Sequence, residues 1–224
     1  MLEYPYGVFE VTVKEGRILA VEKVEKVKIA VNGGIQFGSK LTSKQLLLIA
    51  KYMGENDELE LTTFQQLYLE IPKENKDDII EEFEQAGLSC YPVGPYVKSL
   101  RTCNFCKGEE EEGMPVAKEL NKRLAGKSVP FTLKPAYTGC PVGCGEPLIN
   151  DIGVMKIKDT YSLYVGGKSK GQDAKAGDLL LESLEPEELY AAVDHIIDTY
   201  NDLGKKREPF HRFVKRVGKE VLVK

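Results

Sequence analysis

The stretch Gly139-Cys140-Pro141-Val142-Gly143-Cys144-Gly145-Glu146-Pro147 carries two cysteines with three residues between them. A second pair stands earlier, in Thr102-Cys103-Asn104-Phe105-Cys106-Lys107-Gly108, with two residues between its cysteines. Spacers this short let both thiolates of a pair reach one metal centre. The glycines let the backbone come close and turn N–H groups toward sulfur, which tunes the potential of an iron–sulfur cluster. The two pairs therefore predict one centre ligated by Cys103, Cys106, Cys140 and Cys144.

Two kinds of centre take four thiolates, an iron–sulfur cluster and a structural zinc ion. The Pro141-Val142-Gly143 spacer and the Glu146-Pro147 exit are unlike the turns of a zinc knuckle. We therefore favour the cluster and keep zinc as the alternative. Arg101 and Lys107 flank the first pair, and positive charge at this position supports thiolates.

The composition and the lack of a secretory signal predict a soluble, cytoplasmic protein. The 224 residues include 29% charged ones, and no apolar run reaches the roughly 18 residues of a membrane span. A net charge of −4 argues against nucleic acid as a partner, because phosphate binding requires a basic surface. Five cysteines behind a start without a secretory signal argue against a disulfide framework. We expect the fifth, Cys90, to be a buried, unreactive thiol.

Residues 1–91 are predicted to form one α+β domain. Thr42 and Gln45 have the spacing of a capping box, in which each side chain satisfies the other residue's backbone N–H. Two helices on one antiparallel sheet would bury the apolar faces of this part. The expected elements are a helix that ends at Gly54, a strand that ends at Pro72, and a helix from Asn75 to Gly87.

Residues 92–224 are predicted to form the second domain, which begins with a linker containing Pro92, Gly94 and Pro95. The apolar face of its long helix is expected to pack on the sheet that contains a predicted hairpin. The expected elements are a helix at Pro115, a strand over about Val129–Tyr137, hairpin strands Asp151–Lys158 and Tyr161–Val165, a long helix from Pro186, and a short basic helix over Pro209–Lys219.

Several motifs resemble those of the siroheme and iron–sulfur sulfite and nitrite reductases. The loop from Gly139 to Cys144 resembles the "GCPNxC" loop of this family, and Leu61–Leu67 resembles its "LTTRQ" strand. The chain has one such unit, like the small single-unit and dissimilatory sulfite reductases. Other matching pieces are the Cys103/Cys106 pair, Pro130 with Lys134 in a Pro-x-Lys-x-Lys stretch, the Gly166-Gly167-Lys168 turn, and the C-terminal helix Phe210–Gly218.

The resemblance implies a ferredoxin-like N-terminal lobe followed by an α/β lobe that binds a [4Fe-4S] cluster and siroheme. It implies an enzyme that reduces sulfite or nitrite with electrons from a donor such as ferredoxin, in a homo- or hetero-oligomer. Cys144 would bridge the cluster to the siroheme iron. The implied catalytic residues are Lys134, Arg101 and Lys168, and the implied siroheme contacts are Thr62, Thr63, Gln65 and Lys134.

The chain departs from the family pattern at three places. Two residues separate Cys103 from Cys106, where the family has five. Phe64 stands where the strand motif has Arg, and Thr132 stands where the lysine stretch has its first Lys. Siroheme carboxylates and oxyanions are bound by such cations. The alternative is therefore a cluster-only electron-transfer subunit or sensor, and a zinc-stabilised binding module is a third reading.

Overall fold

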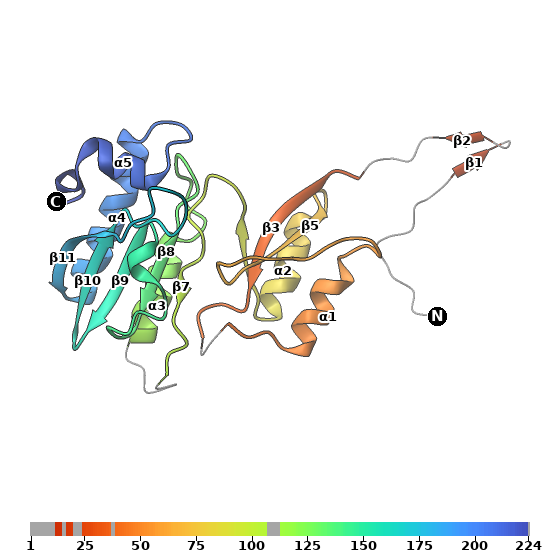
Figure 1. The fold of residues 1–224 in the computed structure, drawn as a ribbon. Helices are drawn as coiled ribbons and strands as arrows, with labels where there is room; N and C mark the ends of the chain where they lie inside the picture. Colours follow the sequence, from red (N-terminus) through yellow and green to blue (C-terminus); the bar gives the residue numbers. More distant parts are fainter. Residues whose placement is uncertain (1–11, 15–16, 20–23, 37–38, 107–112, 224) are drawn as a thin grey trace. The chain divides into compact units, whose positions relative to one another are not determined.

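The computed structural model describes residues 12–14, 17–19, 24–36, 39–106 and 113–223. The chain divides into two compact units (Figure 1). Unit 1 comprises Met1–Gly34 and Leu41–Cys90, and unit 2 comprises Ile35–Lys40 and Tyr91–Lys224. The domain boundary predicted between residues 91 and 92 lies one residue beyond the change from unit 1 to unit 2. No helix in the described ranges has the length and apolar character needed to cross a bilayer.

Unit 1 has the predicted ferredoxin-like architecture. Its four-stranded sheet has the order β4-β5-β3-β6, and the chain runs strand, helix, two strands, helix, strand. Strand β5 pairs antiparallel with both β3 and β4. A separate antiparallel pair, β1 with β2, precedes this sheet in sequence. The bounds are β1 Thr12–Lys14, β2 Arg17–Leu19, β3 Lys26–Asn32, α1 Ser43–Lys51, β4 Glu60–Leu61, β5 Leu67–Pro72, α2 Lys76–Gln85 and β6 Ser89–Pro92.

The start of α1 confirms the capping box. The Thr42 hydroxyl accepts the Gln45 N–H at 3.2 Å, and the Gln45 amide oxygen accepts the Thr42 N–H at 2.9 Å. These two bonds satisfy backbone donors that a helix end leaves unpaired. The helix then places Ile49 in one core cluster with Phe83 of α2 and Leu69 of β5, so both helices pack on the sheet.

Unit 2 contains a five-stranded mixed sheet of order β11-β10-β9-β8-β7 (Figure 1). Strands β7, β8 and β9 are parallel, while β10 is antiparallel to both of its neighbours. The bounds are β7 Arg101–Thr102, α3 Gly113–Leu124, β8 Pro135–Thr138, the 3-10 helix η2 Pro147–Ile149, β9 Ile152–Ile157, β10 Thr160–Val165, β11 Asp178–Leu184, α4 Pro186–Leu203, α5 Phe210–Val217 and the 3-10 helix η3 Lys219–Leu222.

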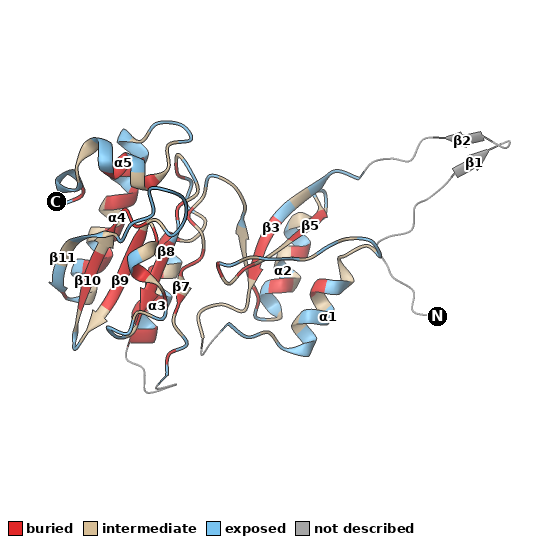
Figure 2. Ribbon diagram, in the orientation of Figure 1, coloured by how far each residue is buried: buried red, intermediate tan, exposed pale blue. Residues whose placement is uncertain are grey.

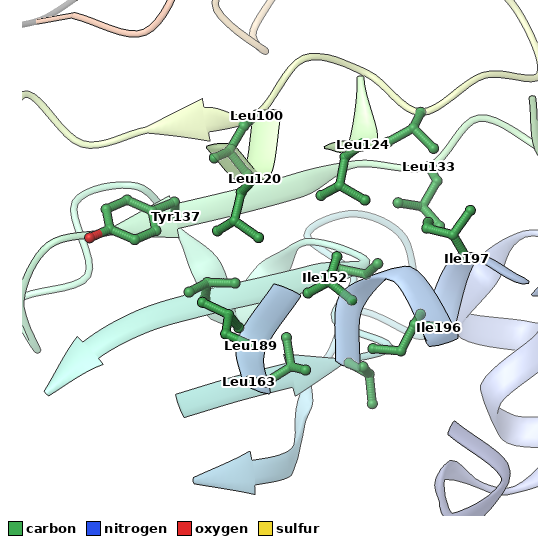
Figure 3. Packing of buried hydrophobic residues seen from close by; sticks show 14 of the residues in the cluster. Leu100, Leu120, Leu124, Leu133, Tyr137, Ile152, Leu163, Leu189, Ile196 and Ile197 are labelled. Carbon is green, nitrogen blue, oxygen red and sulfur yellow. The ribbon is translucent and has the colours of Figure 1, made fainter. Parts of the chain in front are cut away.

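Helices α3 and α4 form the core of unit 2 with the sheet. Leu120 and Leu124 of α3 share one buried cluster with Leu189, Ile196 and Ile197 of α4 and with side chains of β8, β9 and β10 (Figure 3). The sides of both helices that face the sheet are buried (Figure 2). The predicted packing of the long helix on the hairpin is confirmed, because α4 contacts β10. The sheet residues that receive the helices include Tyr137, Ile152 and Leu163.

The strand predicted over Val129–Tyr137 is wrong in its first half. The regular strand begins only at Pro135, because the backbone before it pairs with the linker instead. Val129 N–H donates to Pro95 O at 3.0 Å, and Leu133 N–H donates to Tyr96 O at 3.2 Å. A proline-rich linker and a proline-rich strand gave no sign that they would pair.

Candidate metal centre

Parallel pairing of β7 with β8 brings the two cysteine loops together. Arg101 lies opposite Ala136 and Thr102 opposite Tyr137, so the next residues of both strands leave the same edge of the sheet. Cys103 N–H donates to Tyr137 O at 3.2 Å. Gly139 N–H donates to the Cys103 Sγ atom at 3.3 Å. A backbone N–H directed at sulfur is the interaction that the glycine-rich sequence predicted, and it stabilises a thiolate.

Gly145 returns the second loop to this strand edge. A Cβ atom at this position would lie 1.9 Å from Tyr137 O and 3.2 Å from Cys103 N. Real Cβ atoms do not approach backbone oxygen so closely, so the loop can return here only through glycine. The residue after Cys144 is therefore in contact with the residue that follows β7.

Phe105 anchors the first cysteine pair in the core of unit 2. Its side chain is 2% exposed and stacks on Tyr137, with ring centroids 6.0 Å apart and planes at 24°. Tyr137 in turn contacts Tyr161 of β10 at 6.3 Å. The φ of Phe105 is +50°, a left-handed conformation that residues with a side chain rarely adopt. Burial of the ring offsets this cost and fixes the chain between Cys103 and Cys106.

The second pair lies on two successive turns. Gly143 N–H donates to Cys140 O at 3.3 Å, and Glu146 N–H donates to Gly143 O at 2.8 Å. Cys140 and Cys144 are exposed, as is Cys106, while Cys103 is half-buried. Val142 between them is 78% exposed. This loop therefore turns its thiols and an apolar side chain outward from the sheet edge.

Four thiols on two adjoining loops are a donor set that fits a [4Fe-4S] cluster. As the side chains stand, no three Cys, His, Asp or Glu residues of the described ranges are gathered closely enough to hold a metal ion. The ligation of one cluster by all four cysteines therefore stays a prediction. When bound, such a cluster accepts and passes on single electrons. Lys107, predicted to flank the first pair, lies outside the described residues.

Arg101, predicted to contact siroheme or substrate, is paired with a carboxylate of the second loop. Its Nη2 atom lies 2.8 Å from Glu146 Oε1, and its side chain is 20% exposed. A guanidinium bound to a carboxylate at this distance has part of its charge neutralised. The described contact therefore connects the two cysteine loops.

Lys134 and Lys168 lie at the other end of the sheet. Lys134 precedes β8, whose four residues span roughly 13 Å, whereas the cysteine loop follows β8. Lys168 follows β10, whose last residue, Val165, pairs with the first residue of β9. Lys168 forms an ion pair with Asp173. Within unit 2, therefore, Lys134 and Lys168 are not gathered with Arg101 at the cysteines.

A carboxyl group with a shifted pKa also lies at this far end. Asp151 Oδ2 accepts the Lys134 N–H at 2.9 Å, just before β9 begins. Desolvation raises the pKa of the Asp151 carboxyl to about 7, although the Lys134 N–H acts in the opposite direction. No pattern in the sequence signals this residue, because its surroundings depend on tertiary contacts, among them the Gly166 N–H that donates to Asp151 O at 2.8 Å.

The residues predicted to contact siroheme from unit 1 form a turn rather than a strand. Thr62 follows β4, and its hydroxyl donates to Gln66 O at 2.7 Å and accepts the Gln66 N–H at 3.2 Å. Thr63 and Gln65 lie in the same turn, and Gln65 has a φ of +56°. The Thr62 side chain therefore closes the β4–β5 hairpin. A contact of these three residues with a tetrapyrrole stays a prediction.

The two positions that lack the family's cations have structural roles here. Phe64 is 6% exposed, so its ring is buried. Thr132 donates its hydroxyl to Gly94 O, which joins the segment before β8 to the linker. Sequence reasoning missed two residues at the cysteine loops, Glu146 and Phe105. Only their positions in the sequence could have pointed to them, since Phe105 stands inside the first cysteine pair and Glu146 stands two residues after Cys144.

Comparison with known proteins assigns the family. Residues 96–224, more than half of the chain, match the model of the nitrite and sulphite reductase 4Fe-4S domain. The chain belongs to this family. The family predicted from the cysteine motifs is thereby confirmed, and so is a [4Fe-4S] cofactor at the level of the domain family.

Relatives of this 4Fe-4S domain occur in proteins of different length. A cobalt-factor III methyltransferase of Priestia megaterium is 35% identical over 190 residues, which are 85% of this chain and 35% of the relative. The chain thus spans about a third of that protein. An assimilatory-type sulfite reductase of Nitratidesulfovibrio vulgaris is 26% identical over 166 residues, 73% of this chain and 76% of the relative. The crystal structure of dissimilatory sulfite reductase I superposes with a TM-score of 0.67 at 15% identity, over 88% of this chain and 68% of that one, which shows a shared fold.

Proposed function

We propose that the chain is an iron–sulfur oxidoreductase domain that passes single electrons through a [4Fe-4S] cluster held by Cys103, Cys106, Cys140 and Cys144. The observation that carries the proposal is the Gly139 N–H to Cys103 Sγ hydrogen bond at 3.3 Å, which joins the two loops. Membership of the 4Fe-4S domain family supports a cluster rather than zinc. A cytoplasmic location, where thiols stay reduced, is part of the proposal.

The first form of this function is reduction of sulfite or nitrite on siroheme, with electrons from a donor such as ferredoxin. Its support is the family and the assimilatory-type sulfite reductase, most of whose length the chain spans. In this form Cys144 bridges the cluster to the siroheme iron, and a partner subunit or a second copy of the chain contributes cations to the anion site.

The second form is a cluster-only electron-transfer domain, and the geometry of unit 2 favours it. Arg101 is paired with Glu146, Lys168 is paired with Asp173, and Lys134 precedes β8 at the far end of the sheet. The methyltransferase relative also shows that this type of domain occurs in a protein whose name describes neither sulfite nor nitrite reduction. Because the family and the sulfite reductase relative support oxyanion reduction, we keep it first and place cluster-only electron transfer second.

Analysis of anaerobically purified protein tests the proposal and separates its two forms. We expect iron and acid-labile sulfide in equal amounts and a broad brown absorption. A sharp additional band in the red region, with extractable tetrapyrrole, would decide for the siroheme form. Zinc without iron or sulfide would contradict both forms.

Cysteine variants test the ligand assignment. Cys144→Ser and Cys103→Ser are expected to lose the cluster iron, because serine oxygen is a poor ligand for iron–sulfur clusters and ligation supports folding. The matched control is Cys90→Ala, since the half-buried Cys90 packs against the unit 1 core and desolvation raises the pKa of its thiol to about 12. Iron content like that of the wild type in Cys144→Ser would contradict the assignment.

A further inference from the structure

We propose that Arg101 and Glu146 form a latch between the two cysteine loops and that its two charges shift the reduction potential of the cluster in opposite directions that nearly cancel. The inference deepens the proposed function and rests on the assignment of the four cysteines to one cluster. It gives both residues a positioning role and does not make either one a ligand.

The latch joins the outer ends of the two cysteine loops. Arg101 stands two residues before Cys103, and Glu146 stands two residues after Cys144. Arg101 Nη2 and Glu146 Oε1 are 2.8 Å apart, with side chains 20% and 43% exposed. Gly145 places the intervening backbone against Cys103 N and Tyr137 O. The ion pair therefore closes a ring of contacts around the point where the two loops meet.

The backbone conformation of Glu146 indicates that its carboxylate has a structural role in the ion pair with Arg101. Its φ is +59°, a left-handed conformation that is unfavourable for any residue with a Cβ atom. Three hydrogen bonds hold it there, from Glu146 N–H to Gly143 O at 2.8 Å, from Asn150 Nδ2 to Glu146 O at 2.8 Å, and from Ile149 N–H to Glu146 O at 3.4 Å. Glycine would fit this conformation better, so the conformation costs free energy that the carboxylate's bond to Arg101 offsets.

Both charges act on a cluster that gains one negative charge on reduction. The Glu146 carboxylate disfavours the added electron and the Arg101 guanidinium favours it, because Coulomb interactions are strong where water is partly excluded. Net charge close to a cluster is one of the factors that set its potential. The two single charge removals must therefore shift the potential in opposite directions.

Three variants and one control test the latch. Glu146→Gln keeps the shape of the side chain and removes its charge, Arg101→Gln removes the opposite charge, and the double variant removes both. The control is Arg123→Gln, which breaks ion pairs with Glu119 of α3 at 2.8 Å and with Asp194 of α4 at 3.0 Å. Arg123 is the penultimate residue of α3, the crossover helix that leads from the cysteine end of β7 back to the start of β8.

The readout is the midpoint potential of the cluster, measured by anaerobic redox titration followed by electron paramagnetic resonance. At the wild-type midpoint potential, Glu146→Gln is expected to hold roughly ten times more reduced than oxidised cluster, a rise of about 59 mV for a one-electron couple. In Arg101→Gln, the ratio of reduced to oxidised cluster at the same potential is expected to fall by a similar factor. The double variant should return close to the wild type, and Arg123→Gln should not shift.

Iron and sulfide content separates failure of this inference from failure of the proposed function. A wild-type protein without a cluster would refute the proposed function. Full cluster content with both single variants within the range of Arg123→Gln, or shifted in the same direction, would overturn the latch. If Arg101→Gln loses iron, Arg101→Lys replaces it, since it keeps the charge and loses the fork. A midpoint potential in Arg101→Lys that equals the wild-type value supports the charge effect. A shifted midpoint potential in this variant, which keeps the positive charge, overturns it.

Discussion

Replacing Phe105 with alanine should destabilise unit 2 and loosen the first cysteine pair. The Phe105 ring is 2% exposed and stacks on Tyr137 at the end of β8, beside the strand that leads into Cys103. Alanine would leave a cavity beneath the loop and remove the group that fixes the chain between the two cysteines. Phenylalanine and alanine would both have to adopt the left-handed φ at position 105, so the backbone cost is the same in the wild type and in the variant.

The magnitude follows from burial. Transfer of a fully buried aromatic side chain from water contributes about 1.5–3 kcal/mol, and the cavity raises the total cost of Phe→Ala to about 3–5 kcal/mol. With an m-value of about 2 kcal/mol per M urea, a loss of 3–4 kcal/mol lowers the urea midpoint of unit 2 by about 1.5–2 M.

The assay is urea unfolding followed by far-ultraviolet circular dichroism, because the chain contains no tryptophan. The transition of unit 2 should move, while the transition of unit 1 should stay where it is in the wild type. The matched control is Phe131→Ala, since Phe131 is also in unit 2 and is 41% exposed. Its loss should cost about 1 kcal/mol or less.

If the free energy of unfolding of Phe105→Ala lies within about 1 kcal/mol of that of Phe131→Ala, the proposed anchoring role of Phe105 is refuted. Iron content provides a second reading of the same variant. If the anchor positions Cys103 and Cys106, the variant loses iron faster than Phe131→Ala in the presence of a chelator, even at urea concentrations where both proteins remain folded.

Two further predictions concern the cysteine loop and the far end of the sheet. Gly145→Ala should prevent the loop from returning to β8, since its Cβ would lie 1.9 Å from Tyr137 O. Cluster iron should fall well below that of Gly143→Ala, whose Cβ would be 4.0 Å from the nearest backbone oxygen and which bears only the strain of a left-handed φ of +79°. Equal iron content in the two variants would contradict this. Because the pKa of Asp151 is raised to about 7 in the folded chain, the native state binds an extra proton between about pH 4 and pH 7, so its stabilising contribution is present at low pH and is lost as pH rises through 7. Asp151→Asn should remove this decline in the free energy of unfolding between about pH 4 and pH 7, measured by urea unfolding, and an unchanged pH dependence would argue against it.

Much of the local structure could be predicted from the sequence, because it depends on neighbours along the chain. The capping box of Thr42 and Gln45, the end of β5 at Pro72 and the hairpin of β9 and β10 lie where the pattern placed them. The strand over Val129–Tyr137 was overextended, since its first half bonds to a linker some thirty residues earlier. Pairing over such a separation leaves no periodic signal in either segment.

The candidate site divides in the same way. Cysteine spacing and the glycines around it predicted the ligand type, and the family comparison agrees with it. The roles of Arg101 and Lys168 could not be derived, because each depends on a carboxylate that only the fold brings near, Glu146 for one and Asp173 for the other. The sequence around a basic residue does not distinguish a side chain that can bind an anion from one that already pairs with a carboxylate.

The cysteine spacing predicted the four ligands, the capping patterns located the starts of helices such as α1, and the family resemblance implied the ferredoxin-like unit that precedes the cysteines. The meeting of the two cysteine loops depends on the fold, because strand order is set by the burial of faces against α3 and α4 and not by spacing along the chain. The fold also decided that Lys134 and Cys140 leave opposite ends of β8. Residues six apart in sequence are separated by the whole length of a strand when the strand is extended.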